Sequence, residues 1–563
     1  MHRDIRLLAE REYDLVIIGG GIFAACAAWD ATLRGLSVAL IEKQDFCSGT
    51  SANSFKFIHG GIRYLQHGDI IRLKSSCRER SAMLRIAPHL VQPMPVLIPT
   101  YGHGTSGKIF LGIGMLLYDL LTLGRNRGIR DPRRQIRWTR FFNKREVLSE
   151  YPDLDPNGLT GATMFSDAQM YNPTRLVLAF IKSAVGRGAQ VANYVEAQYL
   201  IREGNRVTGV QAIDRISNAR LDIKAKVVLN AAGPWSDWLL EKALPETKPK
   251  KNVYSRDACF VVKRRFSSPR AIAVQGRTKD PDALISRPAR HLFLVPWRDY
   301  TLVGVWHVVW KQHPEQVTVK EDEVQSFIDE INWAYPTLKL ETKDVCMWNA
   351  GLVPFGENEE GADNLSYGKR SHFIDHKESD DLENLVTLIG IRYTTARGDS
   401  AKAIDLICSK LGKRGGKAAT ESTPVAGGDI ADFEALVQKL YEQQSASLSE
   451  KGLSEKCVRA LAHNYGTEAA EVIDIAVQDN SLAATLGDSQ VLKAEVAYAV
   501  KQEMACNLAD VVFRRTDLAT GSNPGEQVLK ECALFMSSLL SWDEEEMQAQ
   551  VDNVVQRFPA WNQ

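Results

Sequence analysis

A cluster of glycines near the start of the chain, followed about twenty residues later by an acid, could bind a nucleotide. These residues are Gly19, Gly20, Gly21 and Glu42. Glycine permits a tight turn and lets the backbone approach a pyrophosphate, and the first N–H groups of a following helix attract the anion. The acid can accept hydrogen bonds from ribose hydroxyls. This spacing predicts a bound dinucleotide, with Ala24 small enough for the helix to pack closely on its strand.

The glycines need a strand before them and a helix after them to work in this way. Residues 14–18 and 37–41 are short apolar runs of the kind found in buried parallel strands. Between them, the alanine-rich stretch 22–34 predicts a helix that Gly35 can end. These elements predict one complete βαβ unit, a fold that NAD and FAD both use.

Three later segments carry a resemblance to a known family. They are CSGTSANSFKFIHGGIRYLQHGD at 47–69, VVLNAAGPWSDWL at 227–239 and LIGIRYTTARGDSA at 388–401. They resemble motifs of the FAD-dependent glycerol-3-phosphate dehydrogenases, within the D-amino-acid-oxidase-like flavoproteins, and residues 495–518 are similar to the C-terminal helical domain of that family. The resemblance implies FAD as the cofactor. It also implies oxidation of the secondary alcohol of glycerol 3-phosphate, or of a related glycerol phosphate derivative, to the ketone.

The resemblance implies which residues contact FAD. Thr50 and Ser51 can donate hydroxyl hydrogens to the pyrophosphate, and glycines allow the backbone to come close to a flat ring. A helix that begins near Thr394 would direct its N–H groups at a reduced flavin. The expected FAD residues are Gly19, Gly20, Gly21, Ala24, Glu42, Lys43, Thr50, Ser51, Lys56, His59, Gly60, Gly61, Val195, Ala232, Gly233, Gly390 and Thr394. Whether FAD is covalently held is left open.

Oxidation of a phosphorylated alcohol needs cations for the phosphate and a base for the hydroxyl proton. By resemblance, Arg63, Tyr64 and Arg370 match residues that face the substrate phosphate. Arg392 stands where the family usually has lysine, and planar guanidinium groups suit phosphate oxygens. His307 could serve as the base, or it could be a core histidine.

Other positions depart from the family pattern. Val353 replaces an arginine, Cys259 replaces a histidine, and residues 304–307 replace a Gly-Thr-Thr-Asp turn. Less positive charge and more bulk fit a substrate with less phosphate charge or a larger group, such as a glycerol phosphodiester or a nucleotide-linked glycerol. An oxidase that uses oxygen, and a flavin-binding protein whose catalytic site has decayed, also stay open.

The expected architecture has three parts. It combines an α/β FAD-binding Rossmann-like domain, an antiparallel-sheet α+β substrate cap and a C-terminal all-helical domain. The expected boundaries are 1–98, 160–252 and 347–415 for the FAD-binding domain, 99–159 and 253–346 for the cap, 416–429 for a polar linker and 430–563 for the helical domain. Within the cap, β-branched and aromatic residues predict strands at 254–266, 291–295 and 300–310, with a turn at 298–299.

Composition argues against several classes of protein. Lys plus Arg and Asp plus Glu both number 69, so the net charge is zero and nucleic acid is not an expected partner. The nine cysteines are scattered without a CxxC pair, which indicates reduced thiols in the cytoplasm and no metal site. The apolar run 109–123 is shorter than the roughly 20 residues that a membrane-spanning helix requires.

One surface feature points to a membrane. Residues 125–145 contain nine Lys or Arg against a single acid, Asp131, directly after the apolar run. A basic segment beside an apolar helix could lie on the inner face of an anionic membrane, so we expect peripheral membrane contact through 109–145. A quinone or another electron acceptor is the second expected partner, and a homodimer is left open.

Overall fold

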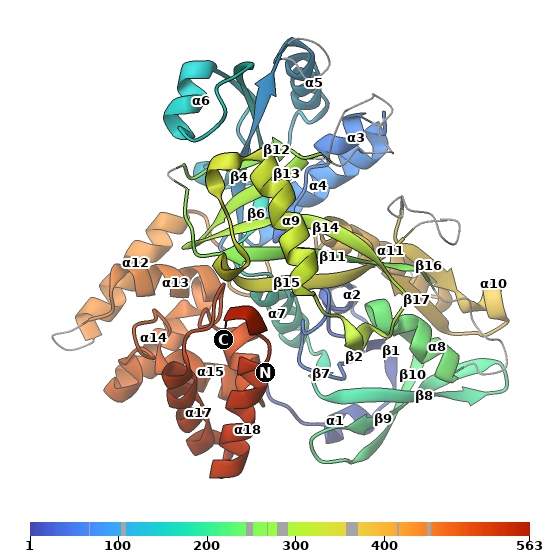
Figure 1. Ribbon diagram of the computed structural model, residues 1–563. Helices are drawn as coiled ribbons and strands as arrows, with labels where there is room; N and C mark the ends of the chain where they lie inside the picture. The colour runs from blue at the N-terminus through green and yellow to red at the C-terminus, as the bar shows by residue number, and fades with distance from the viewer. Residues whose placement is uncertain are drawn as a thin grey trace.

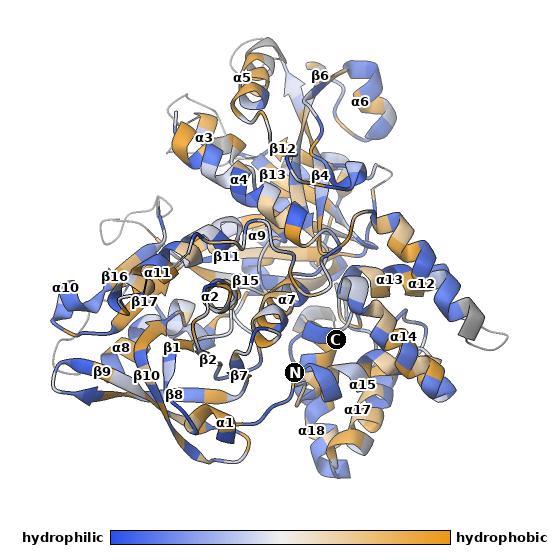
Figure 2. Cartoon of the chain, turned by 180° about the vertical axis from the view of Figure 1, so that it is seen from behind, coloured by the Kyte–Doolittle hydropathy of each residue, from blue (hydrophilic) through white to orange (hydrophobic). Residues whose placement is uncertain are grey.

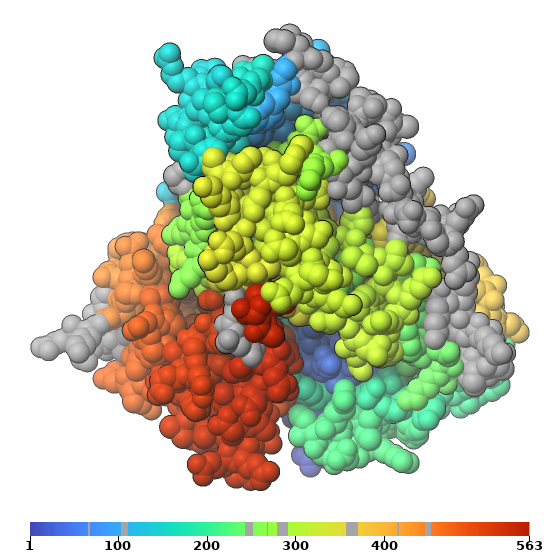
Figure 3. Space-filling view, in the orientation of Figure 1, coloured from blue at the N-terminus to red at the C-terminus, as the bar shows by residue number. Residues whose placement is uncertain are grey.

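Figure 1 shows the computed structural model of the chain, in which the described residues form two β-sheets and a set of C-terminal helices. The structure describes residues 1–66, 68–102, 108–243, 252–266, 268–277, 291–355, 370–413, 416–447 and 452–562. In the space-filling view of Figure 3, the yellow and red parts of the chain cover most of the blue N-terminal part on this face. The nucleotide-binding unit therefore lies beneath the later parts of the chain.

The predicted βαβ unit is confirmed. Strand β1 (Tyr13–Ile18) is wholly buried, helix α2 (Ile22–Leu33) follows the glycines, and β2 (Val38–Ile41) pairs with β1 in parallel. Gly19 has a φ of 118°, and a Cβ atom there would lie 2.5 Å from the carbonyl oxygen of Ala231. Only glycine fits this turn, because any side chain would collide with the neighbouring backbone.

The first sheet is built around this unit. In spatial order its strands are β16 (His372–Asp375), β17 (Leu385–Ile389), β10 (Arg220–Asn230), β1, β2 and β7 (Gln190–Ala192). All of these neighbours pair in parallel except β16 and β17. One face packs in a shared apolar cluster against α2, α7 (Pro173–Val185) and α11 (Ala396–Lys410). The other face packs against α1 (Arg6–Ala9), α8 (Ser236–Ala243) and the antiparallel pair β8 (Val195–Glu203) and β9 (Arg206–Asp214). Strand β9 also pairs antiparallel with the first half of β10, so this pair extends the sheet.

The second sheet forms the cap. In spatial order its strands are β15 (Val345–Pro354), β11 (Tyr254–Val262), β14 (Tyr300–Trp310), β13 (His291–Trp297), β12 (Ala271–Gln275), β4 (Val91–Tyr101), β6 (Leu159–Met170) and β3 (Phe57–Ile58), with β5 (Arg140–Asn143) also paired to β6. The predicted turn joins β13 to β14 at 298–299. Helix α9 (Glu321–Ala334) covers one face with Val324, Phe327 and Ile328.

The cap sheet takes in more of the chain than we expected. Strands β4, β6 and β15 belong to it, whereas the expected boundaries placed 91–98, 160–170 and 347–354 in the FAD-binding domain. The physical reason is strand pairing: β4 and β6 pair along almost their whole lengths, and β15 pairs with β11. An apolar pattern predicts a strand but does not specify which sheet it joins.

Further helices connect or flank the sheets. They are α3 (Ile62–Gln66), α4 (Ile70–Ile86), α5 (Lys108–Leu121), α6 (Lys144–Glu150) and α10 (His376–Asp380). Figure 2 shows α5 in the colour of apolar residues, at the end of the cap farthest from the first sheet.

The C-terminal part is helical, as predicted. Its helices are α12 (Phe433–Ser447), α13 (Glu455–Tyr465), α14 (Ala469–Gln478), α15 (Lys493–Gln502), α16 (Leu508–Asp510), α17 (Glu526–Leu540) and α18 (Glu544–Val555). The segment before it, expected to be a linker, packs against the first domain. There the N–H of Val425 donates to the carbonyl of Ile86 at 3.1 Å, and Arg397 donates to the hydroxyl of Thr420 at 3.0 Å.

Candidate FAD and active site

A cavity of about 400 Å³ lies at the carboxyl ends of β1 and β2. That volume is within the range of small-molecule and cofactor sites. Among the residues that line it are the following expected FAD residues: Gly19, Gly20, Gly21, Glu42, Lys43, Thr50, Ser51, Val195, Ala232, Gly233 and Gly390. Residues from β1, β2, β8 and the segment after β10 therefore meet at one site, as the nucleotide-binding pattern requires.

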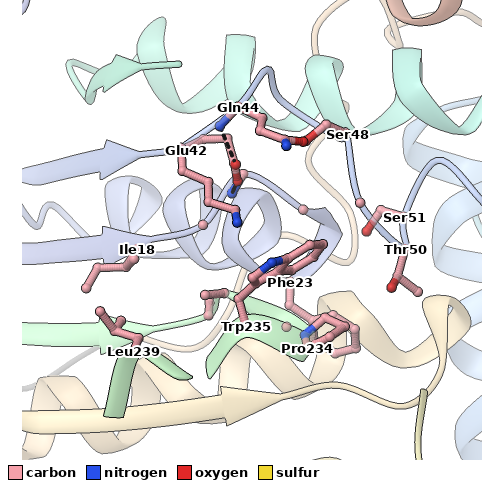
Figure 4. Close-up of a pocket in the computed structure, with 18 of the residues that line it drawn as sticks. Ile18, Phe23, Glu42, Gln44, Ser48, Thr50, Ser51, Pro234, Trp235 and Leu239 are labelled. Atoms are coloured by element: carbon pink, nitrogen blue, oxygen red, sulfur yellow. Dashed lines mark hydrogen bonds between the residues drawn. The ribbon is translucent and has the colours of Figure 1, made fainter. Parts of the chain in front are cut away.

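Glu42 is held at the end of β2 by backbone donors. Its carboxylate accepts the N–H of Gly20 at 2.6 Å and the N–H of Gln44 at 2.9 Å, and Figure 4 shows the second of these bonds. Burial raises the pKa of Glu42, while the two N–H groups act in the opposite direction. A carboxylate offers about four acceptor positions, so this fixed group can still accept hydrogen bonds from ribose hydroxyls.

The glycine turn leaves no room for side chains where a pyrophosphate would lie. A Cβ atom on Gly20 would be 2.9 Å from the side chain of Glu42, and one on Gly21 would be 3.1 Å from the hydroxyl oxygen of Ser51. That hydroxyl accepts the N–H of Ile22 at 3.0 Å, at the first residue of α2. The bare backbone at the start of a helix fits a dinucleotide phosphate.

The remaining expected FAD residues do not line this cavity. They are Ala24, Lys56, His59, Gly60, Gly61 and Thr394. Ala24 is fully buried inside α2. Lys56 lies against the cap, where its ammonium donates to the side-chain oxygen of Asn349 at 3.3 Å and stands 4.7 Å from the centre of the Trp297 ring. Burial lowers the pKa of Lys56 to about 8.

His59 forms a pair with Asp167, a carboxylate on β6 that the sequence did not single out. The Nδ1 atom of His59 lies 3.0 Å from Asp167, and about half of the His59 side chain is exposed. Asp167 is itself buried, and it accepts the N–H of Gly60 at 2.5 Å and the guanidinium of Arg80 at 3.0 Å. Burial would raise the pKa of Asp167, but His59 and Arg80 outweigh it and hold the pKa below its usual range.

This network explains the glycine after His59. A Cβ atom on Gly60 would lie 2.1 Å from Arg80 and 2.5 Å from the hydroxyl oxygen of Tyr118. Tyr118 is on α5, and Arg80 donates to its hydroxyl at 3.0 Å. The close approach that Gly60 permits is therefore to buried polar side chains of α4 and α5.

Two of the expected substrate residues, Arg392 and Tyr64, lie together beside this pair. Arg392 donates to the hydroxyl of Tyr64 at 2.8 Å and to the hydroxyl of Ser76 at 3.2 Å. The guanidinium of Arg72 lies 5.0 Å from the centre of the Tyr64 ring. The hydroxyl of Thr394 accepts the backbone N–H of His59 at 3.0 Å, which joins the segment that carries Arg392 to the His59–Asp167 pair.

Arg370 precedes β16, and Arg63 belongs to α3. Burial would raise the pKa of Asp69, the residue before α4, but Arg72 lowers this pKa through its hydrogen bonds and its charge. The charge of Arg370 also lowers the pKa of Asp69, so Arg370 lies near the start of α4. The backbone of Arg63 is in α3, and its side chain lies outside the described residues.

The positions that depart from the family pattern lie on the cap sheet. Cys259 on β11 is opposite Gly304 and Asn349, and Val353 on β15 is opposite Ser255. His307 on β14 is opposite Asp257, and it is not among the residues that line the cavity, so its role as the base stays a prediction. Burial raises the pKa of the Cys259 thiol to about 11, although the charge of Lys56 opposes this.

Sequence reasoning missed part of the cavity wall. Trp235 and Trp238 after β10, and His313 and Glu315 after β14, also line the cavity. The two tryptophans lie in the motif at 227–239, which the resemblance implied to be beside the cofactor. Their large side chains could therefore have been predicted to line the site. The other two belong to the cap and follow no motif.

Comparisons with known proteins support this site. Residues 14–398 match the family model for FAD dependent oxidoreductases, and residues 418–547 match the C-terminal domain of alpha-glycerophosphate oxidase. The aerobic glycerol-3-phosphate dehydrogenase of Bacillus subtilis is 30% identical over 97% of this chain and 95% of its own length. The enzyme of the same name from Staphylococcus aureus is 30% identical over 90% of this chain and 87% of its own length.

A solved structure extends the similarity to the fold. The glycerol-3-phosphate dehydrogenase of Bacillus halodurans, crystallised with FAD, superimposes with a TM-score of 0.77 and 25% identity, over 98% of this chain and 96% of that one. A cavity whose glycines, acid and hydroxyls suit a dinucleotide thus occurs in a chain whose relatives use FAD. The chain is an FAD-dependent oxidoreductase and belongs to the FAD-dependent glycerol-3-phosphate dehydrogenase family.

Proposed function

We propose that the protein oxidises the secondary alcohol of glycerol 3-phosphate, or of a related glycerol phosphate derivative, to the ketone. One observation carries the proposal: the hydroxyl of Thr394 connects the His59–Asp167 pair to the segment in which Arg392 contacts Tyr64. A base beside a cation suits an alcohol that also carries a phosphate. The two curated relatives, named for glycerol 3-phosphate, support the same substrate class.

In this proposal His59, in place of His307, is the base. When its Nδ1–H donates to the carboxylate of Asp167, its Nε2 atom is free to accept the proton of the substrate hydroxyl. Arg392 donates to the phosphate oxygens, and Tyr64 orients it. The two-electron oxidation of the carbon that carries the hydroxyl would be supplied by bound FAD. The residues expected to hold it are those that line the cavity.

The substituted positions support a modified substrate as the alternative. Cys259 and Val353 offer no positive charge to a phosphate, whereas the family pattern has a histidine and an arginine at these two positions. A glycerol phosphodiester or a nucleotide-linked glycerol carries less charge on its phosphate, so it needs fewer cations.

Anaerobic titration tests these alternatives. Purified holoenzyme is titrated with glycerol 3-phosphate, with glycerophosphodiesters and with nucleotide-linked glycerol, while the absorbance of oxidised flavin is followed. Bleaching by glycerol 3-phosphate supports the first proposal, and bleaching by the larger esters alone supports the modified substrate. Bleaching by none of them contradicts both and favours a decayed site. Hydrogen peroxide formed under air would identify an oxidase, whereas reduction of a quinone would identify a dehydrogenase that uses it.

We propose further that α5 and the basic segment after it place the protein on the inner face of an anionic membrane. The outer face of α5 carries Ile113, Leu116, Leu117 and Leu120, and Leu123 follows; these side chains are 45–64% exposed. Their spacing of three and four residues puts them on one side of the helix. Tyr118 and Met115, on the other side, are buried. Among the described residues, no helix is both long and apolar enough to cross a membrane.

Charge and aromatic residues complete the proposed membrane surface. Trp138 is 60% exposed, and its segment carries the arginines that follow α5. An amphipathic helix binds lipid through its apolar face, and each Lys or Arg near an anionic surface adds about 1 kcal/mol. The expected acceptor, a quinone, would then be dissolved in the same membrane.

Vesicle sedimentation tests the membrane proposal. We expect the protein to sediment with vesicles of phosphatidylcholine and phosphatidylglycerol, less so at high salt, and the variant Leu116→Ser/Leu120→Ser/Leu123→Ser to remain in solution. Leu534→Ser, which changes an equally exposed leucine of α17, is the matched control and should still sediment. Failure of the natural protein to sediment would contradict the proposal, and dimers that the triple variant abolishes would instead show that a second copy covers α5.

A further inference from the structure

The end of the cavity that holds Glu42 is covered by side chains from the cap. His313 and Glu315 lie after β14, in and next to the short 3₁₀ helix Pro314–Gln316, and both line the cavity. The wall opposite them is formed by Lys43 and by Trp235 and Trp238. Since Glu42 is the acid expected to bind ribose, this is the adenosine end of the FAD site.

An ion pair joins two of these lining residues. The ammonium of Lys43 contacts the carboxylate of Glu315, and it also lies 4.6 Å from the centre of the Trp235 ring. The hydrogen bond from Lys43 is the main reason that the pKa of Glu315 is lowered, with smaller contributions from His313 and Arg215. Lys43 immediately follows Glu42, so the pair joins the cap to the residue next to the ribose-binding acid.

A second contact joins two other lining residues. The ring of His313 meets the ring of Trp238 edge-on, with centroids 5.0 Å apart and an interplanar angle of 82°. His313 also shapes its own segment, because its Nδ1 atom accepts the N–H of Glu315 at 3.3 Å. Both cap residues are therefore held in position to contact the first domain.

We propose that residues 313–316 form a clasp that closes over the adenosine half of FAD and slows its release. Each contact joins one cap residue to one residue of the nucleotide-binding domain, and all four residues line the cavity. The clasp lies at the cavity that Glu42 lines, and it acts on cofactor retention whatever the substrate is. It rests on FAD binding alone and not on the proposed reaction.

The rate of FAD release tests the clasp. Holoenzyme is diluted in the dark, and the fluorescence of free FAD is followed with time. A partly exposed ion pair contributes about 0.2–1 kcal/mol, so Glu315→Gln should release FAD up to about fivefold faster at low salt. His313→Ala should release it about two- to tenfold faster, because an aromatic edge contact is lost.

Control variants and salt separate the clasp from a general loosening of the cap. Glu321→Gln makes the same chemical change at an exposed position of the first turn of α9, and it should leave the rate unchanged. Rising salt should speed release from the natural protein but have little effect on Glu315→Gln, because the ion pair that salt screens is already gone. In Lys43→Met/Glu315→Gln, the two effects should not add. Release from Glu315→Gln at the natural rate, or equal acceleration by Glu321→Gln, would overturn the proposal.

Discussion

Asp167 is the residue on which the proposed chemistry depends most. It is buried on β6, accepts a backbone N–H beside His59 and is paired with Arg80. An asparagine could keep the shape, but it could not accept in the same way from both His59 and Arg80. The histidine would then lose the partner that leaves its Nε2 atom free to take a proton.

Asp167→Asn should therefore slow the reduction of FAD by substrate about a hundredfold or more, while FAD remains bound. Anaerobic stopped-flow absorbance measures this rate. Asp119→Asn is the matched control, because Asp119 is a similarly buried carboxylate that pairs with Arg125 at 2.7 Å and accepts the N–H of Thr139 at 2.8 Å. An unchanged rate in Asp167→Asn would exclude the pair as the base.

Arg392 offers a test of phosphate binding. Loss of a charged hydrogen-bond donor costs about 1.5–3 kcal/mol, so Arg392→Met should lower kcat/KM for a phosphorylated substrate about 10- to 150-fold. Arg392→Lys keeps the charge and should retain more of the activity. Steady-state kinetics with a glycerol phosphate and with unphosphorylated glycerol would show whether the loss depends on the phosphate. Equal losses with both substrates would contradict the assignment.

At the residue level, the sequence predicted the glycine turn and Glu42 because backbone geometry limits which residues can serve there. It did not predict Asp167. An aspartate on a strand carries no local signal, and its partners His59 and Arg80 are 108 and 87 residues away in the chain.

Elements were easier to predict than their partners. The strands at 254–262 and 300–310 and the helix at 22–33 follow from β-branched, aromatic and alanine content, as expected. The membership of β4 and β6 in the cap sheet was not predictable, since it depends on pairing between segments far apart in sequence.

The first turn of α15 contains a buried carboxyl group whose titration should be measurable. Glu495 accepts the N–H of Leu492 at 3.0 Å, and burial raises its pKa to about 8 from an ordinary value of 4.5. Between these pH values the folded protein holds a proton that the unfolded chain has lost. The stability that this proton confers is present below pH 4.5, decreases as the pH rises and is lost above about pH 8.

Glu495→Gln cannot titrate, so its stability relative to the natural protein should improve as the pH is raised from about 5 to about 9, by at most about 5 kcal/mol. Thermal unfolding of both proteins across this range measures the difference. Glu526→Gln, at an exposed position in the first turn of α17, should show no such trend. A constant difference between Glu495→Gln and the natural protein would contradict the prediction.

Across the whole molecule, buried ion pairs join the C-terminal helices to the nucleotide-binding unit. Asp45, three residues after Glu42, contacts Arg514 at 2.6 Å and Arg515 at 2.7 Å. Glu503 contacts Arg175 on α7 at 2.6 Å. The resemblance predicted the order of the three parts, but it could not show that the last part holds the loop beside Glu42.

Asp45→Asn should therefore weaken FAD binding as well as the fold. Removal of one partner from a buried pair leaves an uncompensated charge and costs about 3–5 kcal/mol. Thermal unfolding with and without added FAD, together with FAD titration of the apoprotein, separates the two effects. Asp405→Asn, which breaks the more exposed pair with Arg34, should change both by much less. Equal effects of the two variants would show that burial of the pair does not matter.

The link between Asp45 and Arg515 has a consequence for how the protein is made. The two residues are 470 positions apart, so the loop next to Glu42 emerges long before the arginines that hold it. At about 5–20 residues per second, the ribosome needs roughly half a minute to a minute and a half to add the intervening chain. During that time the nucleotide-binding unit has its glycines and Glu42, but it lacks the two arginines that pair with Asp45. Tight capture of FAD is thus deferred until synthesis is nearly complete, and shortened chains would compete poorly for the cofactor.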